Sequence, residues 1–71
     1  MFEVKVSMTG FSSNELESNG TFNSHEDAIN DILRMNKAMK AWGRNFFVVY
    51  KNRLEIERYV YDGIKLKKVS K

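Results

Sequence analysis

The side chains that could perform acid–base, nucleophilic or metal chemistry are few in this sequence. His25 is the only histidine and cysteine is absent, so a catalytic triad and a thiolate zinc site both lack parts. Glu55 and Glu57 have the spacing of a carboxylate pair, but we expect solvated or ion-paired side chains, with Lys68 as the partner of Glu57. No phosphate-binding glycine loop or dinucleotide motif is present. We therefore expect a protein that is not an enzyme and that has neither a cofactor nor a metal.

Hydrophobic periodicity predicts the elements of the first half of the chain. Residues 2–8 alternate between apolar and polar types, as in a half-buried strand, and a polar loop over 10–20 leads to a short returning strand at 21–23. Ser24 is a good N-cap for a helix over 25–42, and His25 then lies on the surface of its first turn. The predicted buried stripe of this helix consists of Ala28, Ile32, Met35, Met39 and Trp42.

Three further strands are predicted in the second half, at 45–51, 54–61 and 64–69. Asn52-Arg53 and Asp62-Gly63 form the two connecting turns, and the second has the composition of a two-residue type I′ turn. The whole chain, residues 1–71, then forms a single α+β domain. Its antiparallel sheet has four to five strands in the order strand, strand, helix, strand, strand, strand, with the amphipathic helix packed on one face.

The predicted register makes both faces of the sheet substantially apolar, while one helix covers only one face. A β-bulge that reshuffles the alternation would resolve this conflict. Otherwise an exposed apolar patch would mark a partner or a self-association site. We expect the aliphatic face, with Phe47 and Val49, under the helix and a tyrosine-rich face outward. Its predicted hydrophobic anchors are Phe46, Tyr50, Tyr59 and Tyr61.

Charge is distributed unevenly along the chain. Residues 1–33 contain one basic and six acidic side chains, a net of −5, and residues 34–71 contain eleven basic and three acidic ones, a net of +8. Four cations fall on the polar side or at the end of the predicted helix: Arg34, Lys37, Lys40 and Arg44. Such a face favours an acidic protein surface or phosphate groups. We expect a binding protein that acts as an inhibitor or adaptor on a larger host protein or ribonucleoprotein complex. Direct binding of RNA or DNA through the basic and aromatic residues is the alternative, and a homodimer could bury the same apolar patch.

Length and composition exclude several other classes. Seventy-one residues allow one domain, and no apolar run approaches the roughly 20 residues of a membrane span. The first residues do not have the pattern of a signal peptide. Because the chain also lacks cysteine, we expect a cytoplasmic protein without a membrane partner.

One resemblance adds to this interpretation. The stretch Gly20-Thr21-Phe22-Asn23-Ser24-His25-Glu26-Asp27-Ala28-Ile29 predicts a short strand that runs directly into a helix, and an antiparallel meander follows. This order of elements, over most of the chain, resembles that of several small phage-encoded proteins that inhibit host machinery, including some anti-CRISPR proteins. The resemblance implies a non-enzymatic protein that blocks a larger host complex. It transfers no particular site residues.

Overall fold

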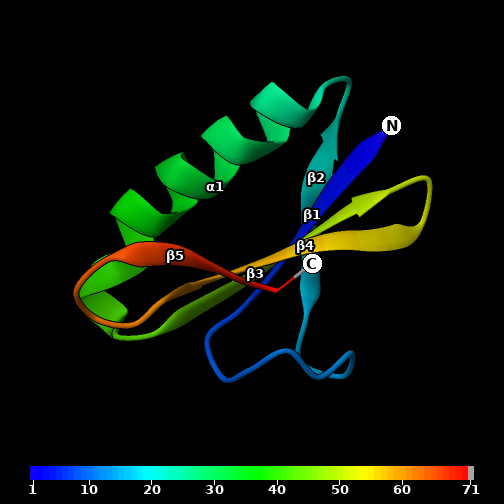
Figure 1. Ribbon diagram of the computed structural model, residues 1–71. Coiled ribbons are helices and arrows are strands. Elements are labelled where there is room, and N and C mark those ends of the chain that lie inside the picture. The colour runs from blue at the N-terminus through cyan, green and yellow to red at the C-terminus, as the bar shows by residue number, and fades with distance from the viewer. Residues whose placement is uncertain (71) are drawn as a thin grey trace.

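The computed structural model describes residues 1–70 and contains one five-stranded antiparallel sheet with a single α-helix on one face (Figure 1). The elements in chain order are β1 (Phe2–Ser7), β2 (Glu17–Phe22), α1 (His25–Met39), the 3₁₀-helix η1 (Lys40–Trp42), β3 (Asn45–Lys51), β4 (Leu54–Tyr61) and β5 (Leu66–Ser70). The spatial order of the strands is β2-β1-β3-β4-β5. The predicted α+β class and order of elements are confirmed.

The helix begins where the sequence predicts and changes type near its end. Ser24 has extended backbone angles, and its hydroxyl accepts a hydrogen bond from the Asp27 backbone N–H at 3.1 Å. After Met39 the chain tightens into η1. A 3₁₀-helix advances about 120° per residue instead of about 100°, so side chains leave the stripe of the preceding α-helix. The prediction that Trp42 is buried is therefore wrong, and 76% of this residue is exposed.

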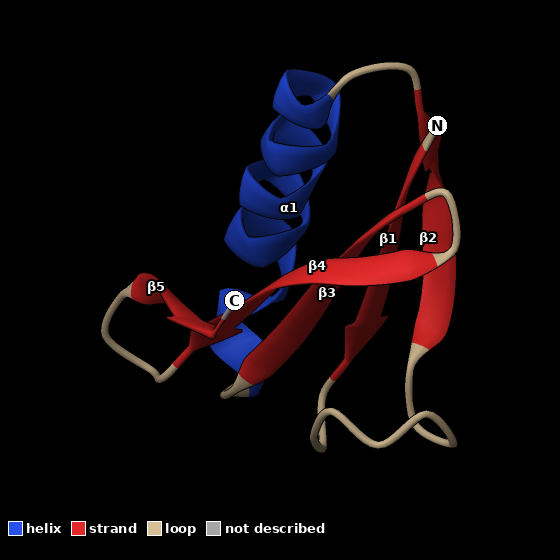
Figure 2. Cartoon of the chain, turned by 45° about the vertical axis from the view of Figure 1, so that its right-hand side comes forward, coloured by secondary structure: helices blue, strands red, loops and turns tan. Residues whose placement is uncertain are grey.

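The core lies between α1 and the first three strands of the sheet order. Val4 of β1 and Phe47 and Val49 of β3 pack against Ala28 and Ile32 of α1, and all five residues are at most 1% exposed. The helix contacts β1, β2 and β3, whereas β4 and β5 extend beyond it (Figure 2). The central strand β3 therefore contributes two of the five fully buried core residues, Phe47 and Val49.

A β-bulge in β4 changes which side chains face the helix. Val49 pairs with Glu57 and Tyr50 pairs with Glu55, so Ile56 is an additional residue in β4. Side chains after the bulge exchange faces relative to a regular ladder. Phe47 of the core consequently lies opposite Tyr59. The prediction that Phe46, Tyr50, Tyr59 and Tyr61 share one open face is wrong, because Tyr59 and Tyr61 lie on the helix side.

The face opposite the helix is partly covered by the loop between β1 and β2. Phe11 of this loop meets the ring of Phe46 edge-on at 5.1 Å between centroids. The guanidinium of Arg58 lies 4.9 Å from the centre of the Phe11 ring, and the Lys5 ammonium lies 4.8 Å from that of Tyr50. Val48, between these side chains on β3, is completely buried. The expected large, open aromatic patch on this face is thus absent from residues 1–70.

Two strand boundaries differ from the prediction. β2 starts at Glu17 instead of residue 21, because pairing with β1 holds the polar segment extended across a bulge at Asn19. The β4–β5 connection has four residues instead of two, and Tyr61 pairs with Leu66 instead of Ile64. The turn at Asn52-Arg53 is confirmed: it has two residues, and both have positive φ, 51° and 71°, as a type I′ turn requires.

Candidate macromolecule-binding surface

The four predicted aromatic anchors are separated by the sheet and are already engaged within the chain. Phe46 and Tyr50 contact Phe11 and Lys5 on the face away from the helix. On the helix side, the Tyr61 hydroxyl donates a hydrogen bond to the Gly63 carbonyl at 3.2 Å, and Tyr59 packs against the core. All four are partly buried. The structure therefore does not bring them together as one surface.

The predicted cations remain exposed at the C-terminal half of α1 and just beyond it. Arg34 is ion-paired with Asp31 at 2.5 Å, which leaves it the least available of the four. Within residues 1–70, no acidic side chain lies at ion-pair distance from Lys37, Lys40 or Arg44. Lys65, in the β4–β5 loop, also has no acidic side chain at ion-pair distance within residues 1–70. These four side chains are positive charges that the folded chain does not neutralise locally.

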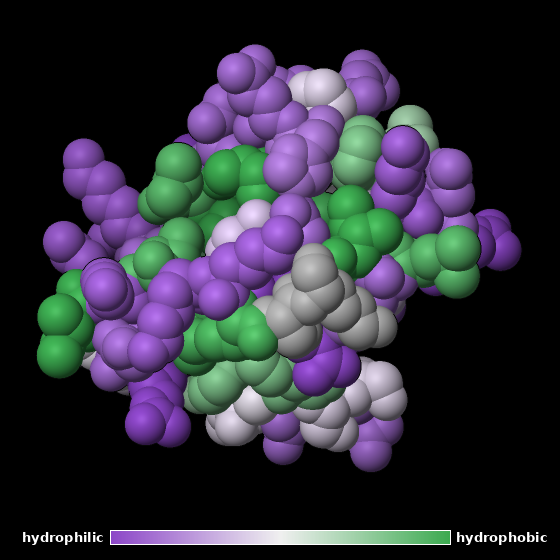
Figure 3. Space-filling model, in the orientation of Figure 1, coloured by the Kyte–Doolittle hydropathy of each residue, from purple (hydrophilic) through white to green (hydrophobic). Residues whose placement is uncertain are grey.

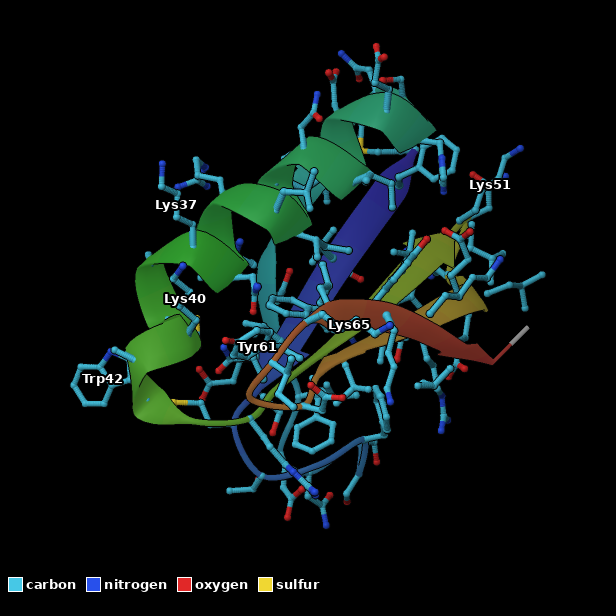
Figure 4. All side chains as sticks on the ribbon, turned by 60° about the vertical axis from the view of Figure 1, so that its left-hand side comes forward. Lys37, Lys40, Trp42, Lys51, Tyr61 and Lys65 are labelled. Atoms are coloured by element: carbon cyan, nitrogen blue, oxygen red, sulfur yellow. The ribbon has the colours of Figure 1, made fainter. Side chains whose placement is uncertain are left out.

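Two exposed apolar side chains accompany these cations. Trp42, in η1, is 76% exposed, and Ile64, in the β4–β5 loop, is 86% exposed. In Figure 1 this loop lies at the same end of the molecule as η1. Figure 4 shows Lys37, Lys40 and Trp42 projecting from α1 and η1, with Lys65 on the neighbouring hairpin. We give the name basic end to these exposed side chains of the α1 terminus, of η1 and the residues just after it, and of the β4–β5 loop: Lys37, Lys40, Trp42, Arg44, Ile64 and Lys65.

The sequence contains a signal for both apolar residues of the basic end. Gly43 directly follows Trp42, and a glycine of the type that ends helices indicates that its neighbour lies in the last helical turn. Ile64 follows Asp62-Gly63, and a four-residue loop leaves it at a hairpin tip. In Figure 3 hydrophobic colour reaches the surface at this tip, next to hydrophilic side chains. Periodicity alone assigns both residues to regular elements and therefore misses them.

The β4–β5 loop presents Ile64 and Lys65 in a defined conformation. The Asp62 carboxylate accepts hydrogen bonds from the backbone N–H groups of Ile64 and Lys65 at 2.9 and 3.1 Å, and its other oxygen lies 3.2 Å from the Lys67 ammonium. These backbone hydrogen bonds, aided by Lys67, lower the pKa of Asp62 to about 2. Asp62, the only acidic residue of this loop, therefore stabilises the loop conformation.

A second cluster of titratable side chains joins the start of α1 to the last two strands. His25 Nε2 lies 2.5 Å from Glu57 Oε1, and the Lys68 ammonium lies 3.3 Å from Glu57 Oε2, as predicted for Lys68. Because a carboxylate only accepts hydrogen bonds, Nε2 of His25 carries the proton. Burial opposes ionisation of Glu57, but the bonds from His25 and Lys68 outweigh it, so the pKa of Glu57 is lowered. Burial and this carboxylate raise the pKa of Tyr59 to about 12.

This cluster has the geometry of a structural clamp. It connects the first residue of α1 to β4 and β5, strands that the helix otherwise scarcely contacts. Glu55, across the bulge, is bound instead by Arg58 at 2.6 Å on the other face of the sheet. The two glutamates that looked like a pair in the sequence are therefore separated.

The fold keeps much of the charge asymmetry of the sequence. The acidic first half supplies β1, β2 and most of α1, and the basic second half supplies β3, β4 and β5, so the two halves occupy opposite sides of the sheet order.

Within residues 1–70, no group of three or more His, Asp or Glu side chains is arranged to hold a metal ion. Neither helix in this part of the chain has the length and apolar character needed to cross a membrane.

Comparison with known proteins gives no family for this chain: no protein-family model, curated protein or solved structure matches it.

Proposed function

We propose that this chain is a small, non-enzymatic binding protein that docks through its basic end on a larger macromolecular complex, as an inhibitor or adaptor. The observation that carries this proposal is the exposure of Trp42 and Ile64 among cations that have no acidic partner in residues 1–70. Tryptophan and arginine are the residues most often found at the energetic centre of interfaces. An inhibitory role also agrees with the resemblance of the element order to small phage-encoded inhibitors.

The proposal replaces the tyrosine face with the basic end as the docking surface. Phe46, Tyr50, Tyr59 and Tyr61 make intrachain contacts that a partner would first have to disrupt, whereas Trp42 and Ile64 are available without rearrangement. Lys37, Lys40 and Arg44 keep their predicted role of steering an acidic partner. Arg34 contributes less, because Asp31 already neutralises its charge.

Direct nucleic-acid binding is the second candidate, and the same cations favour it. Unpaired lysines and arginines next to an exposed tryptophan could contact phosphates while the indole stacks on a base. The two functions differ in salt dependence. Nucleic-acid binding loses affinity linearly on a log–log plot against salt concentration, with a slope set by the number of phosphates contacted.

The test is affinity capture from lysate of the natural host with W42A and I64A variants, with and without nuclease. We expect each variant to lose the partner that the wild-type chain retains after nuclease treatment. The matched control is L54A, because Leu54 is also strongly exposed, at 71%, but lies in the β3–β4 hairpin at the other end of the molecule. Equal loss of the partner with L54A, or full retention with W42A and I64A, would contradict the proposal.

A further inference from the structure

We infer that the partner of the basic end is a protein segment that combines acidic with large apolar side chains. This inference rests on the proposed function and specifies the chemistry of the occupant. It follows from three properties of the basic end: the aliphatic nature of one anchor, the unbalanced positive charge around both anchors, and the prepared conformation of the loop that carries Ile64.

The aliphatic anchor separates a protein partner from a nucleic acid. An indole such as that of Trp42 can stack on a base or fill an apolar pocket, so it does not discriminate between the two. The butyl side chain of Ile64 has no π-face on which a base could stack. At 86% exposure it can remove apolar surface from water only against apolar groups, and protein side chains supply these. The pair of anchors therefore favours a protein.

The charge of the surface specifies the rest of the partner. Lys37, Lys40, Arg44 and Lys65 have no acidic side chain at ion-pair distance within residues 1–70. The nearby Asp62 carboxylate is occupied by two backbone N–H groups and Lys67, so it does not offset them. A neutral apolar segment would leave these cations without partners at the interface, whereas acidic residues beside the apolar ones would neutralise them.

The conformation of the surface lowers the cost of binding. The Asp62 hydrogen bonds fix the backbone at Ile64 and Lys65, and the Gly43 N–H bonds to the Lys40 carbonyl at 3.3 Å to close η1 below Trp42. Both anchors are thus carried by backbone that is ordered before the partner arrives. An ordered surface loses less conformational entropy on binding than a disordered one.

The experiment uses three probes of matched length: a peptide of repeated Glu-Glu-Leu-Leu blocks, a peptide of repeated Glu-Glu-Ser-Ser blocks with the same charge, and a single-stranded oligothymidylate. Trp42 is the only tryptophan of the chain, so its fluorescence reports directly on the basic end. We expect the first peptide to shift the emission to shorter wavelength and to protect the indole from quenching. The second peptide and the oligonucleotide should bind at least about tenfold more weakly.

Variants place the peptide on the surface. By fluorescence anisotropy of the labelled Glu-Glu-Leu-Leu peptide, W42A and I64A should each weaken binding about tenfold. Reversal of charge in K37E/K40E should weaken it mainly by slowing association. L54A and K51E are the controls, because Leu54 and Lys51 are exposed in the β3–β4 hairpin at the other end of the molecule. Far-UV circular dichroism of each variant verifies the fold.

Two outcomes would overturn the inference. Tighter binding of the oligonucleotide than of the Glu-Glu-Leu-Leu peptide would assign the surface to nucleic acid. Equal binding of both peptides, or of neither, would show that Ile64 and Trp42 do not select apolar residues in an acidic segment. If either occurs while W42A and I64A still abolish capture of the natural partner, only the inference on partner chemistry fails. If capture is unaffected by these variants, the proposed function itself fails.

Discussion

Replacing Phe11 with alanine tests the cover over the sheet face opposite the helix. The substitution removes an edge-on contact with Phe46 at 5.1 Å and a ring beneath the Arg58 guanidinium at 4.9 Å. An aromatic pair contributes about 1 kcal/mol beyond its buried area, and a partly exposed cation–π contact about 0.5–1 kcal/mol. Renewed exposure of apolar surface on Phe46 costs about 1 kcal/mol more, at about 25 cal/mol for each Å² exposed. We therefore expect F11A to lose about 2.5 kcal/mol of unfolding free energy.

This loss is large for a chain of 71 residues. A core of this size typically supplies no more than about 3–5 kcal/mol of net stability, so F11A would retain about half or less. The corresponding fall in melting temperature is about 10–20 °C. Urea unfolding followed by far-UV circular dichroism measures the free energy, and binding of a hydrophobic dye to the folded variant reports exposure of the sheet face.

Two control variants distinguish the contribution of the Phe11 ring to stability from that of the rest of the loop. F11L keeps an apolar cover but lacks the π-system, so it should lose only about 1–1.5 kcal/mol. M8A alters an exposed residue of the same loop and should change stability by less than about 0.5 kcal/mol. If F11A unfolds within about 0.5 kcal/mol of the wild type and binds no dye, Phe11 does not cover this face. An open aromatic docking face would then have to be reconsidered.

Four further predictions concern backbone strain, the clamp and a buried carboxylate. R53G should stabilise the chain by about 0.5–1 kcal/mol in thermal unfolding, because Arg53 has a φ of 71° that glycine adopts without steric cost. Because the pKa of Glu57 is lowered, the stability that this carboxylate contributes is fully present above its ordinary pKa of 4.5 and is lost as the pH falls through its folded-state pKa. The unfolding free energy of E57Q should therefore fall less than that of the wild type when the pH is lowered. Tyr59, with its pKa raised to about 12, should give an ionisation step near that pH in an absorbance titration. It should make stability decline between pH 10 and about 12, because the unfolded chain releases that proton first. D31A should lose about 1.5–3 kcal/mol in urea unfolding, because Asp31 is buried and accepts a 2.6 Å bond from Asn19 of β2.

Each of these predictions has an outcome that contradicts it. A lower melting temperature for R53G would mean that the Arg53 side chain contributes more than its backbone strain costs. If the loss of stability at low pH is unchanged in E57Q, Glu57 does not cause that pH dependence. If an ionisation step near pH 12 persists in Y59F, that step does not belong to Tyr59. If D31A and an N19A variant show additive losses in a double-mutant cycle, the bond between the two side chains does not couple α1 to β2.

The separation of the two glutamates in β4 illustrates how far one bulge reaches. A regular ladder would place Glu55 and Glu57 on one face, next to each other. With Ile56 as an additional residue, Glu57 turns to His25 and Lys68 while Glu55 binds Arg58 on the other face. The same change carries Tyr59 into the clamp. One additional residue in β4 thus places Tyr59 and Tyr61 on a different face from the one that strand alternation predicts.

Elements with local signals could be predicted from the amino-acid sequence. The Ser24 cap, the apolar stripe at Ala28 and Ile32, and the two-residue turn before Leu54 depend on neighbours a few residues away, and all were predicted. The cations at the end of the helix were also visible in the sequence, but only the structure showed that Asp31 pairs with Arg34 and that Lys37, Lys40 and Arg44 have no such partner within residues 1–70. The α+β order of elements follows from these signals.

Which side chains face solvent depends on contacts between residues that are distant in the sequence. The bulge at Ile56 depends on how β3 and β4 fit together over the core, and the cover on the opposite face depends on Phe11, some 35 residues away from Phe46 in sequence. Trp42 left the buried stripe because the chain had to tighten into η1 before entering β3. Such long-range fits depend on packing in three dimensions, which periodicity does not encode. The basic end therefore became visible as one surface only when the helix terminus and the β4–β5 loop were brought to the same end of the molecule.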